Sequence, residues 1–160
     1  MSRQQYRVFK NTLLALIRAD RQTELHEWCL FQLIRHYLDP EFFRVPPGRP
    51  RHRKLSRVKN QLRTVLSVLA YHGDNDPGLT FKTAASSLDF TDMTIAPAEA
   101  CDVAAFSRAV HQLNDCYPLL KPRILKAMAL AASIDGERNP QQRELICSVA
   151  AVMDCPTPHP

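Results

Sequence analysis

One pattern of residues occurs twice, near opposite ends of the chain. In each copy an apolar helical pattern ends in an aspartate, a few polar residues follow, and a second helical pattern carries a glutamate near its start. The first copy spans residues 13–33 with Asp20 and Glu27, and the second spans residues 124–152 with Asp135 and Glu144. Two similar helix-loop-helix units of this kind predict two halves of one helical domain.

The length of the chain allows one such domain. With 160 residues, of which 45% are hydrophobic, the chain can bury a sizeable core but is short for two independent ones. We therefore expect a single all-helical domain over residues 1–155. A tail follows over residues 156–160, where a proline at every second position excludes a regular helix.

Hydrophobic periodicity predicts an all-α fold of about seven helices. Apolar residues recur at helical spacing, and no segment shows the alternation that is typical of a half-buried strand. The predicted helices cover residues 4–18, 24–38, 54–71, 79–87, 98–114, 119–133 and 140–153. We expect Thr23 and Asn139 to cap the second and seventh helices, and Asp39-Pro40 to end the second.

The first two predicted helices carry large apolar faces. In the first helix the face consists of Tyr6, Phe9, Leu13, Leu16 and Ile17. In the second it consists of Leu25, Trp28, Cys29, Phe31, Leu33, Ile34 and Tyr37. Because apolar faces of this width are normally buried, we expect both helices to contribute to the core, with the second near its centre.

The acidic residues of the repeated pattern have two explanations. An aspartate just past a helix end can accept hydrogen bonds from the amides of the next turn, and the helix dipole favours carboxylates at helix starts. The alternative is a cation site between the two units, built from Asp20, Glu24, Glu27, Asp135, Glu137 and Glu144. Since the first explanation suffices, we expect no bound metal and no other cofactor in this chain.

No other group of residues predicts a reaction centre. The segment His26-Glu27-Trp28-Cys29-Leu30 is similar to the zinc-binding pattern H-E-x-x-H, but leucine replaces the second histidine, and Trp28 and Leu30 are expected in the core. The five cysteines form no C-x-x-C pair and are expected to be reduced, mostly buried thiols. We therefore expect no catalytic residue and no enzymatic activity of this chain.

Positive charge is concentrated in one proline-rich segment. Between residues 44 and 63 the chain carries Lys and Arg but no acidic residue, and its prolines predict an exposed loop over residues 40–53. The residues expected to contact an anionic surface are Arg44, Arg49, Arg51, Arg53, Lys54 and Arg57. The segment is consistent with a solvated loop or with contact to anionic lipid head groups. Nucleic acid is a poorer partner because no aromatic residue is interleaved for base stacking.

Several motifs resemble those of a known family. They are Leu13-Leu14-Ala15-Leu16-Ile17-Arg18-Ala19-Asp20, Glu27-Trp28, Leu119-Leu120-Lys121-Pro122-Arg123-Ile124-Leu125-Lys126-Ala127, Asp135-Gly136 and Asp154-Cys155-Pro156. They resemble the C-terminal region of bacterial membrane-bound zinc metallopeptidases of the CAAX-protease and HtpX-like group. That region is itself similar to the TerB-like helical domains of tellurite-resistance and DjlA-type proteins. The similarity covers nearly the whole chain and is best at its two ends.

The resemblance implies a TerB-like bundle that is a non-catalytic part or partner of a membrane peptidase. Such a domain would bind the peptidase, its membrane portion or another protein, and would regulate proteolysis in protein quality control. Zinc would belong to the peptidase domain, because H-E-x-x-H is absent here. The implied location is cytoplasmic, at the inner face of the bacterial membrane, although no apolar stretch of this chain reaches the roughly 20 residues that span a bilayer. The alternatives are a stand-alone stress-related metal-sensing module and an anionic-lipid-binding module.

Overall fold

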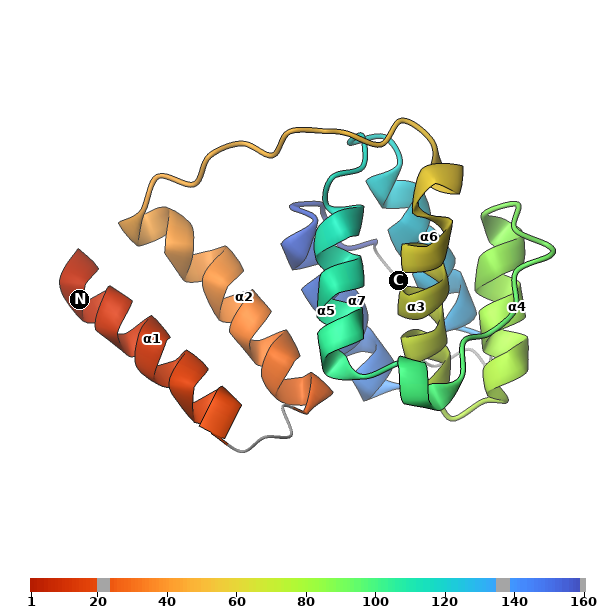
Figure 1. Ribbon diagram of the computed structural model, residues 1–160, viewed down its shortest axis with the longest axis horizontal. Helices are drawn as coiled ribbons and strands as arrows, with labels where there is room; N and C mark the ends of the chain where they lie inside the picture. Colours follow the sequence, from red (N-terminus) through yellow and green to blue (C-terminus); the bar gives the residue numbers. More distant parts are fainter. Residues whose placement is uncertain (20–23, 135–138, 159–160) are drawn as a thin grey trace.

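The computed structural model describes residues 1–19, 24–134 and 139–158 and is built from α-helices (Figure 1). In chain order these are α1 (Arg3–Ala19), α2 (Leu25–Phe42), α3 (Lys59–Tyr71), α4 (Pro77–Ser87), α5 (Val103–Leu113), α6 (Lys121–Ala131) and α7 (Pro140–Val152), with the 3-10 turns η1 (Leu55–Val58) and η2 (Ala98–Ala100). The described residues contain no β-strand. The predicted all-α class with seven helices is confirmed.

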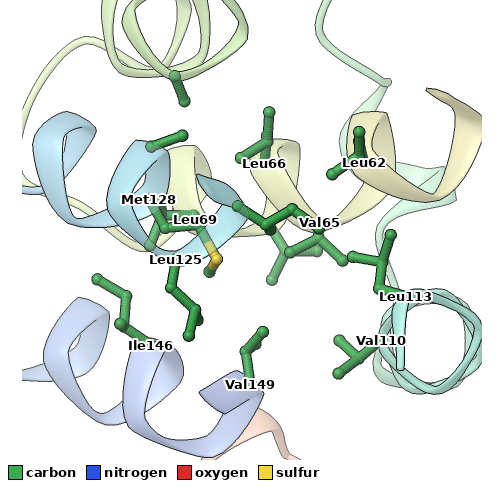
Figure 2. Close-up of a cluster of buried hydrophobic side chains, with 14 of the residues drawn as sticks. Leu62, Val65, Leu66, Leu69, Val110, Leu113, Leu125, Met128, Ile146 and Val149 are labelled. Carbon is green, nitrogen blue, oxygen red and sulfur yellow. The ribbon is translucent and has the colours of Figure 1, made fainter. Parts of the chain in front are cut away.

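The core is built around α3, which packs against α4, α5 and α6. Its side chains Leu62, Leu66 and Leu69 are fully buried. Figure 2 shows them among side chains from α5, α6 and α7, including Leu125 and Val149. Burying one leucine contributes roughly 1.5–3 kcal/mol, so the contacts of α3 supply a large part of the hydrophobic stabilisation.

The α1–α2 hairpin lies at one side of this core (Figure 1). α2 packs along α7, and α1 packs on α2. On α2, Trp28, Cys29 and Phe31 are buried as predicted, but Tyr37 is exposed. The predicted position of the whole α2 face in the core is therefore wrong, because the hairpin is peripheral and one side of α2 faces solvent.

The predicted buried face of α1 is also wrong in part. Tyr6 is buried and Leu13 and Ile17 are partly buried, but Phe9 and Leu16 are 40% and 66% exposed. The reason is that α1 has an extensive contact with α2 alone, so a single side of the helix is covered. An apolar surface of α1 consequently faces solvent.

α2 continues past Pro40 to Phe42, so the prediction that Asp39-Pro40 ends it is wrong. A proline at this position removes one backbone hydrogen bond. Contacts with α1 hold the last turn nonetheless, because Phe42 stacks on Tyr6 with ring centroids 4.5 Å apart. The amide of Phe43 then donates to the carbonyl of Asp39 at 2.8 Å. The exposed loop therefore begins at Phe43 and not at residue 40.

Other predicted helix ends move by a few residues. The third helix begins with the 3-10 turn η1 in place of an α-turn at Lys54, and the segment predicted as one helix from residue 98 is divided into η2 and α5. α5 begins at Val103 because the carboxylate of Asp102 accepts a hydrogen bond from the amide of Ala105 at 2.7 Å. α6 covers Lys121–Ala131, a shorter span than the predicted 119–133.

The remaining capping residues are partly as predicted. Asn139 caps α7 by accepting from the amide of Gln141 at 2.8 Å, which confirms the prediction. α4 begins at Pro77, two residues earlier than predicted, because Asp76 caps it. The N-cap of α2 is Glu24, and the predicted cap Thr23 lies outside the described residues.

A mostly buried carboxylate joins α1 to α2. Asp39 accepts a hydrogen bond from the hydroxyl of Tyr6 at 2.8 Å and binds the ammonium of Lys10 at 2.8 Å, with Arg35 at 3.5 Å. Burial raises the pKa of this carboxyl, but the hydrogen bonds from Lys10 and Tyr6 and the charges of Lys10 and Arg35 outweigh burial and lower it. Burial and the hydrogen bond to Asp39 raise the pKa of Tyr6, so its hydroxyl stays protonated.

We expect Asp39→Ala to release α1 from α2 without unfolding the core. The change leaves Tyr6 and Lys10 without their acceptor, which costs roughly 1–3 kcal/mol. Hydrogen exchange should show α1 amides losing about tenfold to a hundredfold in protection, with α3 amides little changed. Because the pKa of Asp39 is lowered, its stabilisation is present above the unfolded value of about 3.9 and is lost as the pH falls through the lower folded value.

Glu41→Ala is the matched control, because Glu41 lies two residues away and is exposed. The control should leave α1 protection unchanged. An equal loss of protection in α1 and α3 after Asp39→Ala would contradict a local role for the junction.

Candidate interaction groove and basic strap

A groove of about 1250 Å³ lies between the α1–α2 hairpin and the helices α3, α5 and α7. It exceeds the roughly 300–1,000 Å³ of an ordinary small-molecule pocket. Its apolar lining includes Leu14, Ile17, Trp28, Phe31, Val103 and Phe106. The groove is therefore formed by residues from both sides, the hairpin and the body of the domain.

The floor of the groove is fixed by an aromatic pair. The rings of Trp28 and Phe106 meet edge to face, with centroids 4.9 Å apart and an interplanar angle of 73°. Both side chains are buried in the core cluster while lining the groove. The contact joins α2 to α5, and it gives the groove a rigid apolar base.

One buried polar group of α2 lies along this base without a hydrogen-bond partner among the described residues. The indole N–H of Trp28 has no acceptor. Buried donors and acceptors are normally paired. The groove therefore offers an unsatisfied donor next to apolar surface.

The charged groups at the rim of the groove are mostly engaged. Lys10 and Arg35 face Asp39, and Asp102 caps α5. Arg18 is exposed and has no partner in the described part of the chain. The rim thus presents both signs of charge around an apolar floor.

Among the described residues, the candidate metal ligands of the sequence are engaged in other contacts. The carboxylate of Glu27 accepts from the amide of Glu24 at 3.3 Å in a capping box, and Glu144 contacts Nδ1 of His26 at 2.8 Å. Asp20, Asp135 and Glu137 lie outside the described residues. Within the described part, no three side chains of His, Cys, Asp or Glu form a group that could hold a metal ion.

The segment His26–Leu30, which is similar to H-E-x-x-H, and the cysteines are buried only in part. Trp28 is buried, but Leu30 is 47% exposed, so its predicted place in the core is wrong. All five cysteines are free; Cys29 and Cys116 are buried, whereas Cys147 is exposed against expectation. Burial raises the pKa of the Cys29 thiol to about 11, which keeps it protonated and unreactive near neutral pH.

Five of the six predicted anionic-surface residues lie on an extended segment that crosses one end of the helix bundle, and the sixth, Arg57, lies in η1. We use the name basic strap for residues 43–54, which run from the end of α2 to η1 (Figure 1). The amides of Arg51 and His52 donate to the carbonyl of Asp115, at 2.7 and 3.1 Å, and the amide of Tyr117 donates to the carbonyl of His52 at 2.9 Å. These bonds fix the second half of the strap against the turn before α6.

The basic residues of this region divide into bound and unbound groups. Nε of Arg53 donates to the hydroxyl of Tyr117 at 2.9 Å, Lys59 binds Asp92 at 3.0 Å, and Arg63 donates to the carbonyl of Thr94 at 2.7 Å. The remaining ones are exposed, and their side chains make no hydrogen bond or ion pair with described residues: Arg44, Arg49, Arg51, Lys54 and Arg57. Five of the six predicted contact residues are therefore available to a partner.

Sequence reasoning did not identify the groove. Its lining comes from α1, α2, α3, α5 and α7, and no local motif marks residues that meet only in the folded chain.

Comparisons with protein-family models, curated proteins and solved structures give no match to this chain. None of the described helices combines the length and apolarity needed to cross a bilayer.

We expect Glu144→Gln to lower the pKa of His26. The hydrogen bond and the negative charge of Glu144 raise this pKa above its ordinary value, and Gln removes the charge and replaces a charge-assisted hydrogen bond by a weaker neutral one. NMR titration of the imidazole protons measures the shift. Because the folded pKa is raised, the pair stabilises the fold below the unfolded value of about 6.5, and this effect is lost as the pH rises through the folded value.

Glu27→Gln serves as the control, since Glu27 contributes a smaller charge effect to the same histidine. Its substitution should leave most of the raised pKa in place. If both variants lowered the pKa of His26 equally, the direct contact with Glu144 would not be its main cause.

Proposed function

We propose that this chain is a non-catalytic TerB-like interaction and regulatory domain, which works with a membrane zinc metallopeptidase in proteolysis and protein quality control. In this proposal α1–α2 and α6–α7 are its two helix-loop-helix units. The motif resemblance at both ends of the chain supports it, and so does the packing of α2 on α7, since these are the second helices of the two units. The observation that carries the proposal is the open groove beside the hairpin.

The groove suits a helical protein segment. An α-helix with its side chains is about 10–12 Å across, and proteins bind amphipathic helices in apolar grooves. The partly exposed apolar side chains Leu14, Ile17 and Val103, which line the groove with the buried Trp28–Phe106 pair, would receive the apolar side of such a segment. The unpaired indole N–H of Trp28 would donate to one of its polar atoms, and Arg18 at the rim would favour an acidic side chain.

The proposal assigns the chemistry to the partner. No residue of this chain is given a catalytic role, and zinc belongs to the peptidase domain. The partner is the peptidase, its membrane portion or a further protein bound to it. The domain then works in the cytoplasm at the inner face of the bacterial membrane.

We expect bound metal to be absent from the purified chain and a chelator to leave its melting curve unchanged. The physical reason is that Glu27 and Glu144 are engaged in a cap and an ion pair. Metal analysis, with thermal melting in the presence of zinc, calcium or chelator, measures this. Stoichiometric metal and a chelator-sensitive melt would favour the alternative of a stand-alone stress-related metal-sensing module.

We expect Ser107→Trp to block the groove and weaken peptidase binding. Ser107 lies on α5 and lines the groove, so an indole there occupies the space of the partner segment. The measurement is co-purification with the membrane zinc metallopeptidase encoded in the same or a neighbouring reading frame. Binding should fall at least tenfold, because the new side chain leaves too little room for a helix in the groove.

Arg108→Trp is the matched control, because Arg108 is the next residue on α5, is exposed and does not line the groove. This variant should bind like the unaltered chain. Equal binding by all three proteins would refute the groove as the contact, and the absence of any such peptidase gene nearby would count against the peptidase partner itself.

A further inference from the structure

One end of the molecule combines unpaired positive charge with an aliphatic tip. The basic strap, η1 and the turn before α6 lie at this end (Figure 1). Its exposed and unpartnered cations are Arg49, Arg51, Lys54 and Arg57, together with Arg123 in the first turn of α6. No acidic residue occurs between Glu41 and Asp74, so the strap and η1 carry no internal counter-charge.

The aliphatic tip is Leu119. It is 86% exposed, the largest exposed fraction among the large hydrophobic side chains of the described residues. It lies two residues after Tyr117, whose amide and hydroxyl are both bonded to the strap. On the strap itself Val45 is 56% exposed. Because water solvates such side chains poorly, this end presents apolar groups beside its cations.

Contacts within the fold hold the basic strap in position without a bound partner. Backbone hydrogen bonds link Arg51 and His52 to Asp115, and the guanidinium of Arg53 lies over the ring of Tyr117 at 5.5 Å. The positions of the neighbouring cations are therefore set by the fold. Less conformational entropy is lost on binding when the contact groups are already ordered.

We propose that this basic end docks on the surface of an anionic lipid bilayer. Arg49, Arg51, Lys54 and Arg57 contact the lipid phosphates, and Leu119 enters the boundary between head groups and acyl chains. Each basic side chain near an anionic membrane adds to the attraction, and an aliphatic side chain adds the transfer of its apolar surface. The proposal concerns a different surface from the groove and holds whether or not the groove binds a peptidase.

The observations favour lipid over nucleic acid. Proteins that bind single strands stack bases on aromatic side chains, but the ring of Tyr117 already lies under Arg53. Duplex DNA is read by an inserted helix or ribbon, whereas this segment is extended and rich in proline. An exposed leucine gains nothing from a phosphate backbone, but it does gain from a bilayer.

The test is vesicle co-sedimentation of the purified chain at low salt. One set of vesicles contains phosphatidylcholine, and the other contains equal parts of phosphatidylcholine and phosphatidylglycerol. We expect binding to the anionic vesicles alone, weakening as salt is added. Replacing Arg49, Arg51 and Arg57 together by Gln should weaken binding about 100-fold, and Leu119→Ser should weaken it about tenfold.

The matched control replaces Lys82, Arg108 and Arg143 together by Gln. These residues are also exposed and unpartnered among the described residues, and they lie on α4, α5 and α7 away from the strap. The control removes the same charge but should leave vesicle binding nearly unchanged. If both triple variants lost vesicle binding equally, the net charge of the chain alone would explain the binding. That result would overturn the proposed surface.

Insertion of Leu119 is tested separately with Leu119→Trp. Brominated lipids should quench the fluorescence of the new indole, while buried Trp28 in the unaltered chain remains unquenched. Absence of quenching would overturn the insertion. Failure to bind anionic vesicles would overturn the lipid surface as a whole. Tighter binding to an oligonucleotide than to these vesicles, lost when Arg49, Arg51 and Arg57 are replaced by Gln, would overturn it too.

Discussion

The packing of α2 along α7 is the contact on which the arrangement of this molecule depends. α7 belongs to the core around α3, and α2 joins the core through buried Cys29 and through Trp28 against Phe106. α1 is then carried by α2, with Asp39 as the polar joint between them. The groove follows from this order of attachment, because α2 is held against the core while α1 extends to the side of it.

Periodicity predicted the helices best where one side of a helix is covered by several neighbours. For α3 the apolar residues Leu62, Leu66 and Leu69 all point into one core, so the pattern and the packing agree. For α1 the pattern counted Phe9 and Leu16 as buried, although α2 alone makes an extensive contact with α1 among the described residues. A sequence records which residues are apolar, but not how many helices will pack against them.

The same limit applies to the charged segment and to the end of α2. The accumulation of Lys and Arg between residues 44 and 63 was evident, yet the division between bound and unbound cations depends on Tyr117, Asp92 and Thr94, which are distant in sequence. Pro40 signalled a helix end, but the stacking of Phe42 on Tyr6 extends the helix by a turn. In each case a tertiary contact prevails over a local preference.

The basic strap also restricts how far the hairpin can move. Between the end of α2 and the first bonded amide at Arg51, the chain has residues 44–50 to span the distance. Fully extended, such a segment reaches about 25 Å, and its prolines keep it stiff. The hairpin and the core are therefore linked at two separate places, by helix packing at α7 and by a short tether at the opposite end of α2. Any widening of the groove is a rotation between these two attachments, with a limit set by the length of the tether.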